Sequence, residues 1–165
     1  MEEIMKEIKP PKMANMEGVS IFLAGSIEMG VAEDWQSYVA GKMQGFECTL
    51  LNPRREEWDS SWKQEQSEDK FNEQVNWEMG YLDKSDVIFM YLAPGTKSPI
   101  SLLELGLHAG SGKMIVVCPD GFWRKGNVDI VCARYGIPCY SDLDEGIGAL
   151  MTKVRQIGSK LAFDI

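Results

Sequence analysis

The chain has 165 residues, of which 44% are hydrophobic, and 17 Lys and Arg against 25 Asp and Glu give a net charge of −8. This length and composition are typical of one globular domain with a sizeable core. The acidic balance argues against binding of a nucleic-acid backbone, which requires a basic surface. No apolar run approaches the roughly 20 residues needed to span a bilayer. The charged N-terminus lacks the apolar centre of a secretory signal, so we expect a cytoplasmic protein.

The four cysteines, Cys48, Cys118, Cys132 and Cys139, are scattered and form no CxxC pair. We expect them to be free thiols in a reducing compartment, mostly buried. The sequence has a single histidine, His108, so its supply of zinc ligands is poor. We therefore expect neither a metal nor another cofactor.

In chain order, residues 1–17 are charged and contain Pro10-Pro11, which predicts a mobile or loosely docked arm before a single domain over residues 18–165. Apolar runs predict five strands, and helical spacing predicts the helices between them. The predicted strands are residues 19–24, 48–51, 87–93, 114–118 and 138–140. The predicted helices are residues 34–44, 69–85, a segment carrying Glu104, 127–135 and 143–160.

This alternation predicts an α/β fold: a single doubly wound, flavodoxin-like domain with a parallel five-stranded sheet in the order 2-1-3-4-5. The ends of the first three strands would then converge on one crevice. Gly25-Ser26, Asn52-Pro53 and the segment from Ser98 to Glu104 would line it. Asn52-Pro53 is equally consistent with simple turn chemistry, and Gly25 with a tight turn.

Two carboxylates occupy unusual places in this pattern. Glu104 is the only charged side chain except His108 between Pro99 and Gly112, and a carboxylate on so apolar a segment is costly to bury. It is either a nucleophile or acid/base group, or a glutamate that reaches water past the edge of the helix. Glu78 falls at helical spacing on an apolar stripe with Phe71, Val75 and Leu82.

The polar loop over residues 54–63 carries two tryptophans, Trp58 and Trp62. These indoles either cover a site and stack on a planar ligand, or pack back on the domain or on another subunit. Two carboxylates aimed at one crevice beside aromatic groups fit chemistry at an acetal carbon. One carboxylate attacks the anomeric carbon, and a second group protonates the leaving group. Cleavage of a nucleoside requires the same parts.

Several segments together resemble the nucleoside 2-deoxyribosyltransferase-like family, which includes 2′-deoxynucleoside 5′-phosphate N-hydrolases. Glu104-Leu105-Gly106 with Ala109 resembles the family's ELG-x-x-A signature, and Leu23-Ala24-Gly25-Ser26-Ile27 resembles its first-strand loop. Asn76-Trp77-Glu78 followed by Asp86-Val87-Ile88 resembles another segment of that family. The resemblance covers roughly residues 19–140, and the order and spacing of the segments are more specific than any one of them.

The resemblance implies that Glu104 attacks C1′ and forms a covalent deoxyribosyl-enzyme, and that Glu78 contacts the base and handles its proton. It places Ser98 at the sugar or its 5′ end, and it implies a homo-oligomer whose subunits complete each other's sites. For Asp86, at the start of a buried strand, we favour a structural role. The substrate-binding residues that we expect are Gly25, Ser26, Asn52, Trp58, Trp77 and Ser98.

The expected function is cleavage or transfer at the N-glycosidic bond of 2′-deoxynucleosides, with deoxyribosyl transfer between bases. The expected partners are thus a small-molecule nucleoside or nucleotide and a free base, without nucleic acid or membrane. One alternative is an N-hydrolase that releases free base, with water as the acceptor. Another is a non-catalytic nucleotide-binding sensor, against which the presence of both Glu78 and Glu104 argues.

The 5′ end of the substrate depends on the loop after the first strand. Relatives that hydrolyse 5′-monophosphates carry an Arg there that helps to hold the phosphate, whereas this chain has Glu28. A carboxylate repels a phosphate dianion, which predicts a preference for unphosphorylated 2′-deoxynucleosides. The opposite interpretation is that Ser98, with Arg54 or Arg55, forms a phosphate site.

Overall fold

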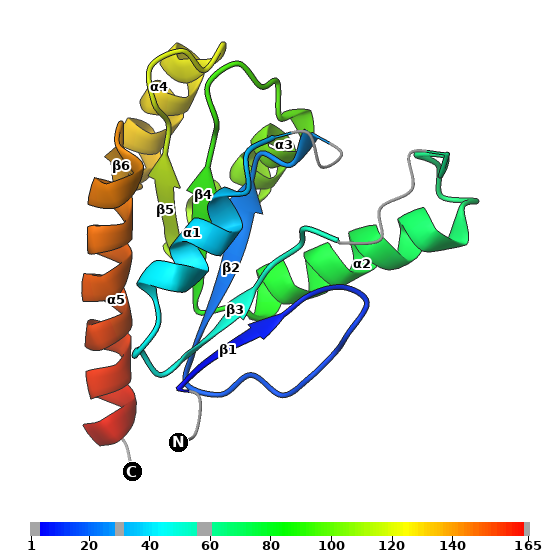
Figure 1. Ribbon diagram of the computed structural model, residues 1–165. Coiled ribbons are helices and arrows are strands. Elements are labelled where there is room, and N and C mark those ends of the chain that lie inside the picture. Colours follow the sequence, from blue (N-terminus) through cyan, green and yellow to red (C-terminus); the bar gives the residue numbers. More distant parts are fainter. Residues whose placement is uncertain (1–3, 29–31, 56–60, 164–165) are drawn as a thin grey trace.

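The computed structural model describes residues 4–28, 32–55 and 61–163. Its centre is a parallel sheet of six strands in the order β1-β3-β2-β4-β5-β6 (Figure 1). The strands are β1 (Met5–Ile8), β2 (Val19–Gly25), β3 (Cys48–Leu51), β4 (Val87–Tyr91), β5 (Met114–Val117) and β6 (Cys139–Tyr140).

Helices connect consecutive strands from β2 onward, as expected for parallel strands, which need crossover connections. The helices are α1 (Trp35–Lys42), α2 (Asp69–Lys84), α3 (Pro99–His108), α4 (Lys125–Tyr135) and α5 (Leu143–Phe163), with a short 3₁₀ turn, η2 (Ala109–Ser111), after α3. No helix in the described ranges is both long and apolar enough to cross a membrane.

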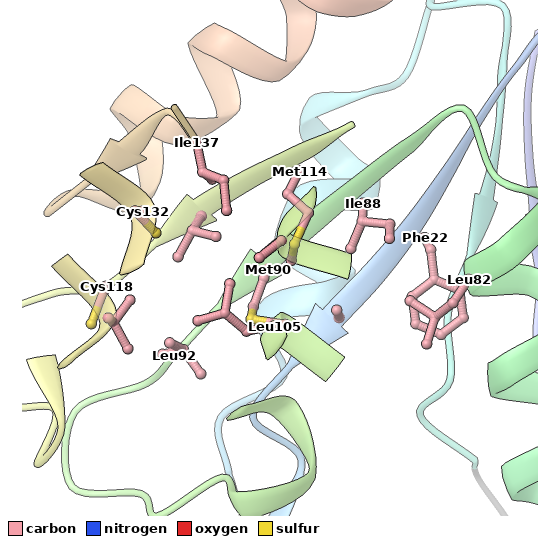
Figure 2. Packing of buried hydrophobic residues seen from close by; sticks show 14 of the residues in the cluster. Phe22, Leu82, Ile88, Met90, Leu92, Leu105, Met114, Cys118, Cys132 and Ile137 are labelled. Atoms are coloured by element: carbon pink, nitrogen blue, oxygen red, sulfur yellow. The ribbon is translucent and has the colours of Figure 1, made fainter. Parts of the chain in front are cut away.

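The helices cover both faces of the sheet. On one face, α2, α3 and α4 pack against alternate strand residues, and part of this cluster, including Phe22, Met90 and Leu105, is shown in Figure 2. On the other face, α1 and α5 cover a second cluster that includes Ile21, Phe89 and Val117. β2, β3, β4 and β5 are nearly continuous apolar runs, with Ser20 and Thr49 as their polar residues, as expected for strands buried on both faces.

The predicted architecture is confirmed in its α/β class and in the order of the five predicted strands, which correspond to β3-β2-β4-β5-β6. The predicted number of strands was wrong, because the sheet has six. The additional strand, β1, lies within residues 1–17 and pairs with β3 at the edge of the sheet, with Ile8 opposite Leu51. It is short and carries Lys6 and Glu7, so hydropathy does not distinguish it from a polar arm.

The strand order reverses at β2, since β3 lies on one side of it and β4 on the other. In doubly wound sheets, ligands bind at such a switch point, outside the carboxyl ends of the strands. β2 and β4 approach closely here: Gly25 has φ +133°, and a Cβ atom on it would lie 2.0 Å from the Tyr91 carbonyl oxygen. Gly25 therefore has a structural reason to be glycine, whether or not it contacts a ligand.

Candidate active site

Glu104 lies on α3, the helix that follows β4. Of the two residues next to it in sequence, Leu105 is buried in the core and Leu103 is exposed. Glu104 therefore lies at the edge of the buried face of α3 and is only partly buried. Burial raises the pKa of the Glu104 carboxyl to about 8, and the negative charge of Glu78 contributes to the rise. The Glu78 carboxylate is thus close enough to influence the protonation of Glu104.

Glu78 lies on α2, which covers the same face of the sheet as α3. Burial raises its pKa to about 7, and a hydrogen bond from Gln74 acts in the opposite direction. The buried Gln74 side chain donates from Nε2 to Glu78 Oε1 at 2.9 Å and to the Pro53 carbonyl oxygen at 2.9 Å. Gln74 therefore fixes the carboxyl of Glu78 relative to the segment that follows β3.

The inward face of α2 differs from the predicted stripe. The buried side chains of the helix are Gln74, Trp77, Tyr81 and Leu82, whereas Phe71 and Val75 are only partly buried. The predicted stripe was therefore displaced around the helix, although Glu78 still belongs to the side that faces the domain. Gln74 itself was not predicted, and its position four residues before Glu78 is the signal that could have revealed it.

The two carboxyls together can hold a single proton near neutral pH. Burial disfavours the charged form of each group, and the negative charge of Glu78 further disfavours the charged form of Glu104. Such a pair offers one carboxylate that can attack or stabilise a cationic centre, and one carboxylic acid that can protonate a leaving group. Among the described residues, no group of three or more His, Cys, Asp or Glu side chains could hold a metal ion.

A cluster of three hydroxyl groups joins the ends of β2 and β4. Ser26 Oγ lies 2.9 Å from Thr96 Oγ1 and 2.6 Å from Ser98 Oγ, and the last two atoms are 2.9 Å apart. Ser26 Oγ also accepts a hydrogen bond from the Ala93 amide. The predicted residues Ser26 and Ser98 therefore come together at the switch point, and Thr96, which was not predicted, completes the cluster.

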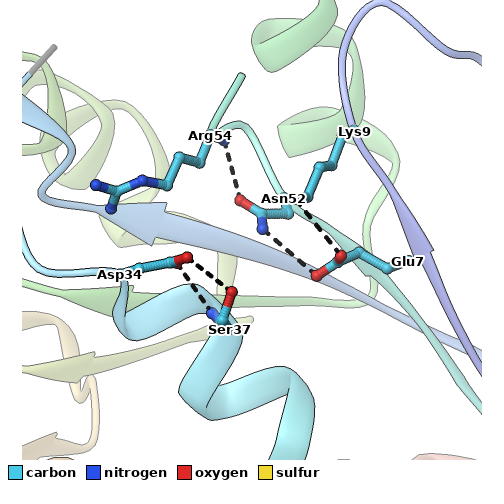
Figure 3. Close-up of polar contacts among 6 residues, drawn as sticks. All are labelled: Glu7, Lys9, Asp34, Ser37, Asn52 and Arg54. Carbon is cyan, nitrogen blue, oxygen red and sulfur yellow. Dashed lines mark hydrogen bonds and ion pairs between the residues drawn. The ribbon is translucent and has the colours of Figure 1, made fainter. Parts of the chain in front are cut away.

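Asn52 follows β3 and is almost fully buried, with both ends of its amide engaged. Its Oδ1 accepts a hydrogen bond from the Arg54 amide at 3.0 Å, and its Nδ2 donates to Glu7 Oε2 at 3.4 Å (Figure 3). The first contact is the turn that an Asn-Pro sequence favours, and the second ties this turn to β1. These contacts account for Asn52 structurally.

Trp77 packs in the core between Phe22 and Tyr81, with ring centroids 6.1 and 4.8 Å away. Its indole N–H donates to the Lys12 carbonyl oxygen at 2.8 Å. This burial favours a packing role for Trp77 over the predicted substrate contact. Trp58 lies outside the described residues.

The second tryptophan of the loop, Trp62, lies beside a buried cation. The Arg55 guanidinium carbon is 5.1 Å from the Trp62 ring centroid, and Arg55 Nη2 bonds Glu73 Oε1 at 2.9 Å. Of the two predicted interpretations, this contact favours packing of Trp62 against the domain.

The family described as "Nucleoside 2-deoxyribosyltransferase like" matches residues 18–122, which is more than half of the chain. The chain belongs to this family. The matched range contains β2 to β5 and α1 to α3, and with them Glu78, Glu104 and the hydroxyl cluster. Membership in the deoxyribosyltransferase-like family points to an enzyme of that type, with nucleoside or base substrates. The comparison with curated proteins gave no match.

Proposed function

We propose that this deoxyribosyltransferase-like protein transfers a 2-deoxyribosyl group between bases, with Glu104 as the nucleophile and Glu78 as the acid and base. The observation that carries the proposal is the pair of carboxyls on α2 and α3, whose pKa values burial raises to about 7 and about 8. A pair that holds one proton at neutral pH supplies both groups that cleavage of an N-glycosidic bond requires.

In the first step, a Glu104 carboxylate oxygen forms a bond to C1′ while the bond from C1′ to the base nitrogen breaks. The bonding electrons leave with the base, and the Glu78 carboxyl gives its proton to the base. In the second step, the nitrogen of an incoming base attacks C1′, the ester bond to Glu104 breaks, and Glu78 takes the proton of the incoming base. Both glutamates return to their starting states.

The reactive arrangement has Glu104 ionised and Glu78 protonated. In the free protein the pKa of Glu104 is the higher of the two. Positive charge develops at C1′ in the transition state, and a cationic centre beside Glu104 favours its ionised form. The transition state therefore favours the arrangement with the proton on Glu78, where the leaving base needs it.

The direct test is incubation with a panel of 2′-deoxynucleosides, with and without a second free base, followed by product chromatography. We expect a new nucleoside only when the second base is present. Release of free base without transfer would indicate the hydrolase alternative. The absence of any reaction across the panel would contradict the proposal.

Substitution separates the two roles. Glu104→Gln should abolish turnover and labelling by a 2-fluoro-2-deoxy-sugar nucleoside, which in the wild type should attach to Glu104 and be located by peptide mass spectrometry. Glu78→Gln should slow turnover by about 10²–10⁴-fold, most for bases that leave poorly. Glu145→Gln, on exposed α5 surface, is the matched control and should react normally. Near-normal turnover by Glu104→Gln would exclude it as the nucleophile.

A further inference from the structure

Arg55 is a buried cation that uses only part of its hydrogen-bonding capacity. Its side chain is 4% exposed, and its Nη2 bonds Glu73 Oε1 on α2 at 2.9 Å. Its Nε and Nη1 atoms are buried and have no hydrogen-bond partner among the described residues. A guanidinium stays charged, and a buried donor without a partner is costly. These two nitrogens therefore point to a ligand that accepts hydrogen bonds.

Gln74, the residue after Glu73 on α2, has an unpaired acceptor. Its Nε2 donates to the Pro53 carbonyl oxygen and to Glu78 Oε1, both at 2.9 Å. Its Oε1 is buried and likewise lacks a hydrogen-bond partner in the part of the chain that the structure describes. The amide cannot turn over without losing both bonds of Nε2, so Oε1 keeps its place as an acceptor.

The unpaired atoms lie where α2 contacts the segment that follows β3 (Figure 1). Arg55 is held at Glu73, and Gln74 is held between Pro53 and Glu78. Glu73 precedes Glu78 by five residues, which corresponds to about 7.5 Å along the helix axis. A planar ring that is hydrogen-bonded at both edges can span this distance, with one edge at Glu78 and the other at Arg55.

The two kinds of unpaired atom define the edge of the ligand, which must offer an acceptor beside a donor. A carbonyl group next to a ring N–H has this pattern, and it occurs in hypoxanthine, guanine, uracil and thymine. Adenine and cytosine present an amino group next to a bare ring nitrogen, so donor and acceptor are exchanged. A phosphate dianion offers acceptors only, so it would leave Gln74 Oε1 unpaired and would meet the carboxyls of Glu73 and Glu78.

The charge of Arg55 favours a carbonyl oxygen during the reaction as well. When the bond from C1′ to the base nitrogen breaks, the bonding electrons stay on the base. The negative charge then spreads onto a carbonyl oxygen that is conjugated with that nitrogen. A guanidinium bonded to this oxygen stabilises the developing charge, while the proton of Glu78 goes to the base. An amino group in place of the carbonyl cannot carry this charge.

We infer that Arg55 and Gln74 select the base: Arg55 donates to its carbonyl oxygen, and Gln74 Oε1 accepts from the adjacent ring N–H. The substrates are then 2′-deoxynucleosides of keto bases, those with a carbonyl next to a ring N–H. This inference rests on the proposed function, because it places the base between Arg55 and Glu78 while Glu104 meets C1′.

The test compares kcat/KM within two matched pairs, 2′-deoxyinosine with 2′-deoxyadenosine and 2′-deoxyuridine with 2′-deoxycytidine. The wild type should prefer the keto base of each pair by roughly tenfold or more, because an amino base leaves buried polar groups unpaired. Arg55→Met keeps the volume without the charge and should lose most of this preference. Arg55→Lys keeps the charge without the planar set of donors and should lose part of it. Arg134→Met removes an exposed charge on α4 and should leave both ratios unchanged.

Calorimetric titration with the free bases makes the inference independent of turnover. Hypoxanthine and uracil should bind the wild type more tightly than adenine and cytosine, and Arg55→Met should remove the difference. If no nucleoside reacts, the proposed function fails, whereas the titration still decides the role of Arg55.

Circular dichroism establishes that Arg55→Met is folded, and Arg55→Lys takes its place in both measurements if it is not. A wild type that uses and binds the amino bases as well as the keto bases would overturn the inference. It would also be overturned by a folded Arg55 variant that keeps the wild-type ratios and base affinities.

Discussion

At the level of single residues, the pKa values of the two glutamates predict how activity depends on pH. Below about pH 7 both carboxyls are protonated, so Glu104 cannot attack; above about pH 8 both are ionised, so no proton is available for the base. We expect a bell-shaped profile of kcat/KM with its maximum between these values, because kcat/KM reports the groups of the free enzyme.

The variant Glu78→Gln distinguishes the limbs of that profile. It removes the group whose ionisation limits activity at high pH, so the descending limb should disappear. It leaves Glu104 as the one titrating carboxyl of the pair, so the ascending limb should follow Glu104 alone, and loss of the Glu78 charge should place the pKa of Glu104 below about 8. A descending limb that persists in Glu78→Gln would show that another group supplies the proton.

At the level of elements, Asp86 connects the start of β4 to the start of β2. Its Oδ2 accepts hydrogen bonds from the Ser20 amide at 2.9 Å and from Ser20 Oγ at 3.1 Å, which supports the structural role predicted for it. Asp86→Ala should lower the free energy of unfolding by about 1–2 kcal/mol, measured by urea denaturation, with kcat unchanged. Asp86→Asn keeps an acceptor and should cost less. A large loss of kcat in folded Asp86→Ala would contradict a purely structural role.

The strands at the centre of the sheet and the helices that cover it could be predicted, because the spacing of apolar residues in each segment indicates its secondary structure. β2 and β3 are apolar except for one residue each, Ser20 and Thr49, and the bounds predicted for β3 match the structure. β1 could not be predicted in this way, because Met5 and Ile8 are its only buried residues and it exists by pairing with a strand 43 positions away, with Met5 opposite Cys48.

In the candidate site, the two carboxylates could be predicted from the sequence. Whether the residues near them are buried in the core or exposed to the site could not be predicted. Glu78 and Glu104 stand out because charge on an apolar segment is rare, and the structure places their helices on one face of the sheet. Trp77 is adjacent to Glu78 in sequence, but its side chain packs in the core. One step along the helix therefore separates a core residue from a site residue. The contact of Glu28 with the amides of Lys97 and Ser98 joins segments 69 and 70 residues apart, so no local pattern contains it.

At the level of the whole molecule, α3 presents an apolar face on the outside of the domain. Ile100, Leu103 and Leu107 follow one another at helical spacing and are 59%, 58% and 62% exposed. They lie on the helix that carries Glu104, and a cluster of exposed apolar residues is typical of protein–protein contacts. We propose that this face forms the subunit contact of the homo-oligomer that the family resemblance implies.

Introducing charge on this face tests the proposal. Leu103→Lys combined with Leu107→Lys should convert the oligomer to a monomer, as measured by size-exclusion chromatography with light scattering, because burying two unpaired ammonium groups is costly. Circular dichroism should show an unchanged fold, since both side chains are exposed in the single chain. Ile130→Lys on α4, where Ile130 is 71% exposed, is the control and should leave the oligomer intact. A wild type that is monomeric at micromolar concentration, or a double variant that remains oligomeric, would show that α3 is not the contact.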